Sequence, residues 1–89
     1  MTFKYKVFSA FGSTKNRRIV IGLTTVQRSG NILKVTHTGN MGNSISNSIN
    51  PNLEKAGFPS IEEMKKEFLV IKKSGSPDYM YSIEFNMGY

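Results

Sequence analysis

The chain has 89 residues, of which 38% are apolar, 20% are charged and none is cysteine. A chain this short supports one hydrophobic core, so we expect a single domain over residues 1–89. Without cysteine, disulfides and thiolate metal sites are excluded, and this favours a cytoplasmic setting over a secreted one. The N-terminal stretch interleaves lysines with aromatic residues, and no segment approaches a membrane span, so we expect no membrane role.

The net charge of +6 is unevenly distributed along the chain. The first 53 residues hold seven basic and no acidic side chains (+7), whereas the other 36 hold five basic and six acidic ones (−1). Uncompensated positive charge repels itself and attracts anions. The asymmetry therefore favours an anionic partner for the N-terminal half, with a merely solvated basic surface as the simpler alternative.

The stretch 2–9 alternates apolar and polar side chains, a pattern typical of a strand with one solvent-exposed face. Its apolar set is Phe3, Tyr5 and Val7, and its basic set is Lys4 and Lys6. We therefore predict a first strand with outward-facing lysines. Residues 12–16 are turn material leading into a second strand.

Residues 17–26 and 32–38 predict a β-hairpin. A three-residue loop at 28–30 would pair Leu23 with Val35 and Thr25 with Leu33, and Gly30 would supply the positive φ that such a loop needs. This register places Leu23, Leu33, Val35 and His37 inward. It places Arg18, Thr24, Lys34, Thr36 and Thr38 outward, with Arg28 at the tip.

The segment 39–50 consists almost entirely of Gly, Asn, Ser and Ile, and it predicts a loop with a role in contacts. A helical turn that packs Ile45, Ile49 and Leu53 is the open alternative, although Ser and Asn weaken helices. Asn50 and the following proline predict the start of a short helix that stops at Gly57.

Ser60 and Glu63 fit the capping box of a second helix. The apolar stripe of that helix, Ile61, Met64 and Phe68, predicts core packing. Residues 68–73 predict a buried strand, 74–78 a turn, and 79–87 a final strand. The inward set of that strand is Tyr79, Tyr81, Ile83, Phe85 and Met87. The predicted class is α+β, with a five-stranded, mainly antiparallel sheet in the order β-β-β-α-α-β-β and helices covering one face.

Little in the sequence points to catalysis. His37 is the only histidine, and without cysteine or a second histidine a metal site or a histidine-pair nuclease is hard to build. Gly39 and Gly42 lie in a polar stretch and do not open a helix after a strand, so no phosphate-cradling motif is present. We expect a protein that is not an enzyme and that uses no cofactor or metal.

Nucleic-acid binding is the function that the charge pattern favours. If the first strand lies beside the hairpin, its lysines extend the outward cations into one positive stripe. The sequence lacks the aromatic signature of RNA-recognition sheets, so affinity would come mainly from phosphates, and a sheet face suits RNA better than the DNA major groove. The expected nucleic-acid-binding residues are Lys4, Lys6, Lys15, Arg17, Arg18, Arg28 and Lys34.

Two further partners remain open. One is a host protein, which the chain would inhibit or adapt by docking through a sheet edge or the 39–50 loop. The other is a second copy of the chain, paired edge to edge as a homodimer.

In size and in Asn, Ser, Ile and Lys content, the segments MTFKYKVFSAF, NMGNSISNSIN and FPSIEEMKKEF resemble small early proteins of bacteriophages, including counter-defence inhibitors. The resemblance implies inhibition of a host defence factor by binding and not by turnover. It also implies a host-cell cytoplasmic location. Because many such inhibitors are acidic mimics of nucleic acid, the basic charge of this chain implies instead a partner that is anionic.

Overall fold

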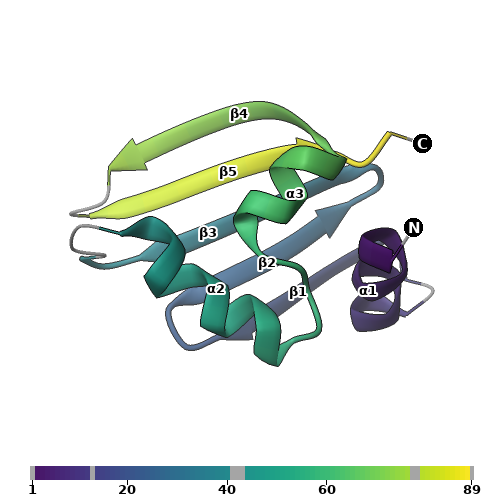
Figure 1. Cartoon of the computed structure of the whole chain (residues 1–89), viewed down its shortest axis with the longest axis horizontal. Helices are drawn as coiled ribbons and strands as arrows, with labels where there is room; N and C mark the ends of the chain where they lie inside the picture. Colours follow the sequence, from purple (N-terminus) through teal and green to yellow (C-terminus); the bar gives the residue numbers. More distant parts are fainter. Residues whose placement is uncertain (1, 13, 41–43, 77–78, 89) are drawn as a thin grey trace.

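The computed structural model describes residues 2–12, 14–40, 44–76 and 79–88. It has an α+β fold in which a five-stranded antiparallel sheet is packed against three helices (Figure 1). The predicted class and the antiparallel sheet are confirmed, but the predicted order of elements is wrong in detail. The order is α1 (Thr2–Phe11), β1 (Asn16–Ile21), β2 (Thr24–Ser29), β3 (Ile32–Thr38), α2 (Ile45–Lys55), α3 (Ile61–Glu67), β4 (Leu69–Ser76) and β5 (Met80–Asn86).

The N-terminal segment is a helix, so the prediction of a first strand over 2–9 is wrong. Val7 and Phe11 are spaced by four, which places them on one side of α1, and both are fully buried in the core. Period-two alternation and a spacing of four coexist in this short segment. Packing of the two residues against the rest of the core therefore decides between strand and helix.

The predicted strand over 17–26 is two strands, β1 and β2, joined by a tight turn at Gly22 and Leu23. Ile21 pairs with Thr24 across this turn, and Gly22 adopts a φ of 59°. Glycine reaches positive φ without the steric cost that a Cβ imposes, so it suits a two-residue hairpin. Because one predicted strand is two strands and another predicted strand is a helix, the sheet still has five strands.

The hairpin of β2 and β3 closes through two residues, Gly30 and Asn31, and not through three. Gly30 does adopt the expected positive φ, at 58°. The register, however, pairs Val26 with Val35, so the predicted pairing of Leu23 with Val35 is wrong. The observed register is shifted by three residues from the predicted one, and a shift by an odd number of residues turns every side chain of a strand to the other face. Thr24 and Arg28 therefore face inward, contrary to prediction, while the inward set on β3 (Leu33, Val35 and His37) is confirmed.

Helix α2 begins well before the predicted start at Asn50. Ser44 is its N-cap, accepting a hydrogen bond from the backbone N–H of Asn47, and Pro51 lies inside the helix. Ile49 and Leu53 are fully buried, so the helical alternative for this segment is the correct one from residue 44 onward. Residues 41–43 of the predicted contact loop lie outside the described residues. The predicted stop is confirmed, with Gly57 at a φ of 83°.

Helix α3 begins as predicted, because the Ser60 hydroxyl accepts a hydrogen bond from the backbone N–H of Glu63 at 3.2 Å. The following strand, β4, is not the predicted buried strand. It lies at the margin of the sheet, and Leu69 and Ile71 are 69% and 45% exposed. Tyr81, Ile83, Phe85 and Met87 are buried as predicted, whereas Tyr79 is exposed.

The strands lie in the order β1-β2-β3-β5-β4, so β5 is inserted between β3 and β4 (Figure 1). The three helices contribute their buried side chains to the same core as one face of the sheet, which we call the helix face. The opposite face, which we call the open face, carries the alternate residues of each strand. None of the helices in the described ranges is long and apolar enough to cross a membrane.

Candidate nucleic-acid interface

The strand registers align the outward side chains of the open face in rows that cross the sheet. The central row contains three basic residues and one acidic residue. From β1 to β4 it runs Arg18, Gln27, Lys34, Glu84 and Lys72. With strands about 4.8 Å apart, successive cations in this row lie about 10 Å apart. The row therefore presents three cations over about 19 Å, with the Glu84 carboxylate between the two lysines.

The next row toward the β1–β2 turn supplies hydroxyl groups. It runs Val20, Thr25, Thr36, Ser82 and Ser74, and because Ser82 is only 4% exposed, the accessible hydroxyls are those of Thr25, Thr36 and Ser74. Hydroxyls donate to and accept from the phosphate oxygens and sugars of nucleic acids. The two rows contain no aromatic side chain, so they can contact a backbone but offer no surface on which bases stack.

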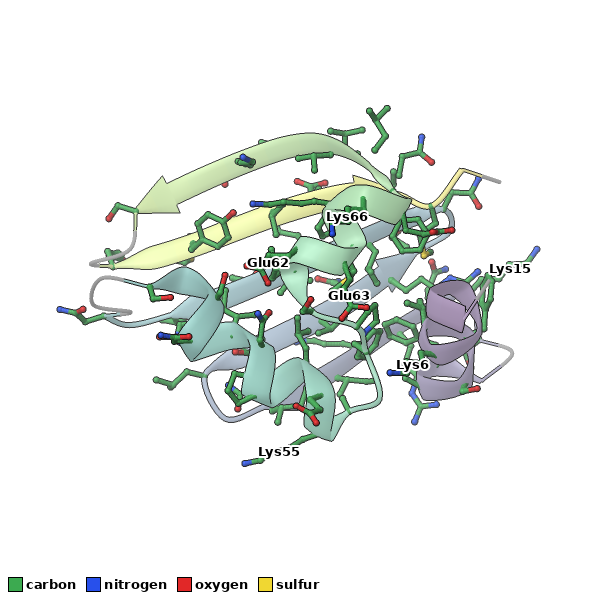
Figure 2. The ribbon with its side chains drawn as sticks, in the orientation of Figure 1. Lys6, Lys15, Lys55, Glu62, Glu63 and Lys66 are labelled. Atoms are coloured by element: carbon green, nitrogen blue, oxygen red, sulfur yellow. The ribbon has the colours of Figure 1, made fainter. Side chains whose placement is uncertain are left out.

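Lys6, Lys15 and Arg17 do not join the central row. Lys6 lies on α1, on the helix side of the sheet, and Lys15 lies near the start of β1 (Figure 2). Arg17 alternates with Arg18 along β1 and therefore belongs to the helix face. Its Nη1 donates a hydrogen bond to the backbone oxygen of Phe11 at 3.4 Å. The side chain of Lys4 lies outside the described residues. The predicted stripe of Lys4 and Lys6 beside Arg18 and Lys34 is therefore wrong, because residues 2–11 are not a strand of this sheet.

Arg28 is a structural residue of the helix face and does not lie at a hairpin tip. It is only 9% exposed. Its Cζ lies 4.6 Å from the centre of the Phe8 ring, and its Nε donates to the backbone oxygen of Gly30 at 3.0 Å. A guanidinium over an aromatic face is a favourable cation–π arrangement. Arg28 therefore attaches α1 to the β2–β3 hairpin.

Basic residues occur in both layers of the fold. The strands carry six basic residues against the single acid Glu84, whereas the three helices together carry four acids and five lysines. Glu62 and Glu63 lie on α3 beside Lys66, with Lys55 at the end of α2 (Figure 2). Of the six strand cations, three lie on the open face, Arg18, Lys34 and Lys72, whereas the other three alternate with them and belong to the helix face.

The Glu62 carboxylate of α3 is engaged in contacts with α2. Glu62 accepts hydrogen bonds from the hydroxyl of Ser46 and from Nδ2 of Asn50, the latter at 2.8 Å. The Ser46 bond, followed by that of Asn50, lowers the pKa of Glu62. This carboxylate thus stays charged and links α3 to α2.

His37 is buried on the helix face in a chain of polar side chains. Nδ2 of Asn52 donates to Oγ1 of Thr24 at 2.9 Å, and that hydroxyl lies 2.7 Å from Nδ1 of His37. Burial lowers the pKa of His37, because it disfavours the charged imidazolium. In the neutral ring, Nδ1 can accept a hydrogen bond from the Thr24 hydroxyl, so both groups have a hydrogen-bond partner. These contacts give His37 a structural role.

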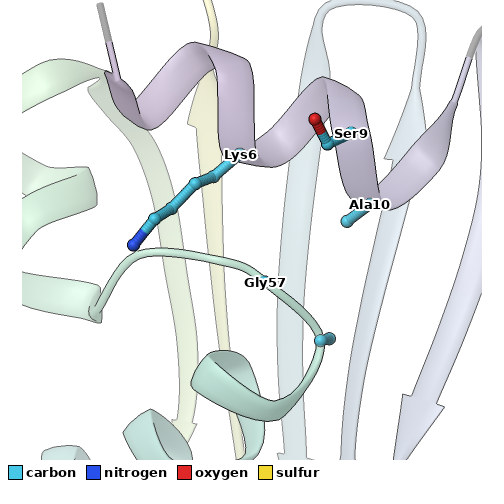
Figure 3. Close-up of a pocket in the computed structure, with 5 residues that line it drawn as sticks. Lys6, Ser9, Ala10 and Gly57 are labelled. Atoms are coloured by element: carbon cyan, nitrogen blue, oxygen red, sulfur yellow. The ribbon is translucent and has the colours of Figure 1, made fainter.

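A hollow of about 370 Å³ lies between α1 and the end of α2. Its lining is Lys6, Ser9, Ala10, Ala56 and Gly57. Lys6 reaches from α1 toward the chain that connects α2 to α3 (Figure 3). The hollow is thus on the helix side, remote in the fold from the central row, and it contains a single charged group.

Lys72 is the member of the row that sequence reasoning missed. Alternation along 79–87 does place Glu84 outward, and a β4–β5 hairpin would bring a lysine opposite it. What the sequence does not show is that β5 lies beside β3, and this adjacency aligns Lys72 with Lys34 through Glu84.

Comparison with protein-family models, with curated proteins and with solved structures finds no match to this chain. Within the described ranges, no three histidine, aspartate or glutamate residues gather into a group that could hold a metal ion. Inference about function therefore rests on the arrangement of side chains.

Proposed function

We propose that this protein binds RNA through the open face of its sheet, by contacts to the sugar-phosphate backbone. The observation that carries the proposal is the central row, which contains the three cations Arg18, Lys34 and Lys72 and one carboxylate, that of Glu84. All three cations are exposed, and the neighbouring row adds hydroxyl donors and acceptors. This combination suits phosphate and ribose groups, including the 2′-hydroxyl that distinguishes RNA from DNA.

The mode of action in this proposal is binding without catalysis. His37 is buried with its Nδ1 against Thr24, which supports a structural role over general acid–base chemistry. Inhibition of a host defence factor, expected from the sequence, is part of the same proposal. The absence of stacking side chains in the two rows predicts weak dependence on RNA sequence.

Salt dependence tests the contact to phosphates. Neutralising three phosphates of a single strand predicts a slope of log affinity against log salt of about −2. Binding to fluorescently labelled single-stranded RNA should therefore weaken roughly 20-fold between about 50 and 200 mM salt in anisotropy titrations. A flat salt response would contradict backbone binding.

Charge reversal locates the interface. The double variant Arg18→Glu/Lys34→Glu removes two of the three cations and should weaken RNA binding more than about tenfold. The matched control Lys55→Glu/Lys66→Glu makes the same change in net charge on the helices and should keep affinity within about twofold. Equal loss in both variants would show that only net charge matters. Loss in the control alone would move the interface to the helix side.

A further inference from the structure

Strand β4 leaves one long edge of the sheet open. It pairs only with β5, and it forms the outer margin of the sheet (Figure 1). It spans eight residues, two more than β1 at the other margin, and all of them except Val70 are exposed. Since no described strand flanks its outer side, the backbone N–H and C=O groups there can pair with an added strand.

Strand β4 begins with three apolar residues, continues with two lysines and ends with Ser74, Gly75 and Ser76. Leu69 and Ile71 are exposed near its start, and Lys72 and Lys73 follow directly. Ile71 sits at a shift in register, so it has no pairing partner in β5. Lys72 pairs opposite Glu84 on the open face, whereas Lys73 pairs opposite Ile83 and has no carboxylate across from it. The edge thus offers two apolar contacts beside uncompensated positive charge.

These lysines disfavour a second copy of the chain as the occupant. A symmetric antiparallel pair that used all of β4 would place Leu69 opposite Ser76, and therefore Lys72 opposite Lys73 of the other copy. Like charges directly opposite each other destabilise strand pairing, and edge lysines and bulges are common protections against self-association. The same charges attract a strand that carries carboxylates at the matching positions.

We propose that the β4 edge binds an extended, acidic segment of a partner protein by strand addition. Backbone hydrogen bonds supply the pairing, carboxylates face Lys72 and Lys73, and apolar side chains cover Leu69 and Ile71. This proposal shares Lys72 with the central row, but its apolar contacts, Leu69 and Ile71, and its second cation, Lys73, lie outside that row.

A peptide designed as the antiparallel complement of β4 tests the proposal. The probe TSTEEVTV has the eight-residue length of β4 and sets its two glutamates opposite the lysines. In anisotropy titrations with the full chain, it should bind with a Kd below about 1 mM. The basic counterpart TSTKKVTV should bind at least about tenfold more weakly, because its charges repel those of the strand. Hydrogen exchange should slow at the amides of β4 when the acidic peptide is bound.

Variants of exposed residues separate this edge from the rest of the sheet. Leu69→Glu/Ile71→Glu should weaken binding of the acidic peptide at least about tenfold. Val20→Glu, at an equally exposed apolar position on the opposite edge strand, should leave binding unchanged. If the first variant fails to fold, Lys73→Glu serves instead, since it should lose preference for the acidic peptide and gain affinity for the basic one.

Several outcomes would overturn the proposal. These are equal binding of the two peptides, no binding of the acidic peptide at about 1 mM, or unchanged exchange in β4 at saturating peptide. A dimer that protects β4 without peptide would assign the edge to a second copy. Protection of β4 by RNA would assign it to the nucleic-acid interface.

Discussion

Arg28 and His37 show how a side chain's position decides what its charge can do. Both have chemistry suited to binding or catalysis, yet both face the helix side of the sheet. Arg28 contacts Phe8 and the Gly30 carbonyl, and His37 contacts Thr24. Burial assigns these two polar groups to the stability of the fold, while the exposed cations of the open face remain available to a ligand.

The lowered pKa of His37 predicts a specific pH dependence of stability. The unfolded chain binds a proton near the ordinary value of 6.5, whereas the folded chain resists protonation of the buried ring. Stability from this site is therefore fully present above pH 6.5 and is lost as the pH falls below that value. Thermal denaturation followed by circular dichroism should show a decreasing Tm on acidification below pH 6.5.

The variant His37→Gln provides the control, because glutamine does not titrate. Its Tm should stay flat in the range where the wild-type Tm falls. Glu62 cannot produce that fall, since its pKa is lowered from 4.5 and its contribution is lost only at more acidic pH. An unchanged slope in His37→Gln would show that another group controls the transition.

At the scale of elements, α1 depends on its tertiary contacts more than on its own sequence. Its first turn has no acidic residue and its last turn no basic one, so charges that favour a helix dipole are missing. Short helices are marginal in water without packing. Phe11 provides that packing, with its ring centre 5.3 Å from that of Phe58 in an edge-to-face arrangement.

Removing Phe11 should therefore destabilise the whole domain. Phe11→Ala deletes a fully buried ring and should lower the free energy of unfolding by about 3–5 kcal/mol in urea denaturation. A double-mutant cycle with Phe58→Ala should give a coupling of about 0.5–1.5 kcal/mol. A loss below about 1 kcal/mol for Phe11→Ala would mean that α1 does not dock stably.

At the scale of the whole molecule, packing all three helices on one face of the sheet leaves the other face without a helix. Antiparallel sheets can keep one face solvated while the other packs on a core, and the open face here keeps its polar residues in aligned rows. Glu84 is the one carboxylate in the central row, and it lies opposite both Lys34 and Lys72. Its negative charge between the two lysines reduces the positive potential that RNA would meet.

Neutralising Glu84 should strengthen RNA binding. One unit charge about 4 Å away in water is worth about 1 kcal/mol, so Glu84→Gln should raise affinity about fivefold and steepen the salt slope. The control Glu54→Gln makes the same change in net charge on α2 and should have a smaller effect. Reduced affinity of Glu84→Gln in anisotropy titrations would contradict the role assigned to the central row.

Local signals in the sequence determined much of this protein. Alternation along β3 and β5 identifies the inward residues Leu33, Val35, Ile83 and Phe85, and the capping box at Ser60 starts α3. Gly30 and Gly57 mark a turn and a helix end. These features depend on residues adjacent in the chain, whose backbone geometry and side-chain period set them directly.

Only the tertiary structure decided the identity of α1, the register of the β2–β3 hairpin and the place of β5 between β3 and β4. A short segment with two periodicities becomes a helix or a strand according to what it packs against, here Phe58 for Phe11. Strand adjacency likewise depends on residues far apart in sequence. The row of Arg18, Lys34 and Lys72 exists because three separated strands are aligned by their pairing, which no local pattern encodes.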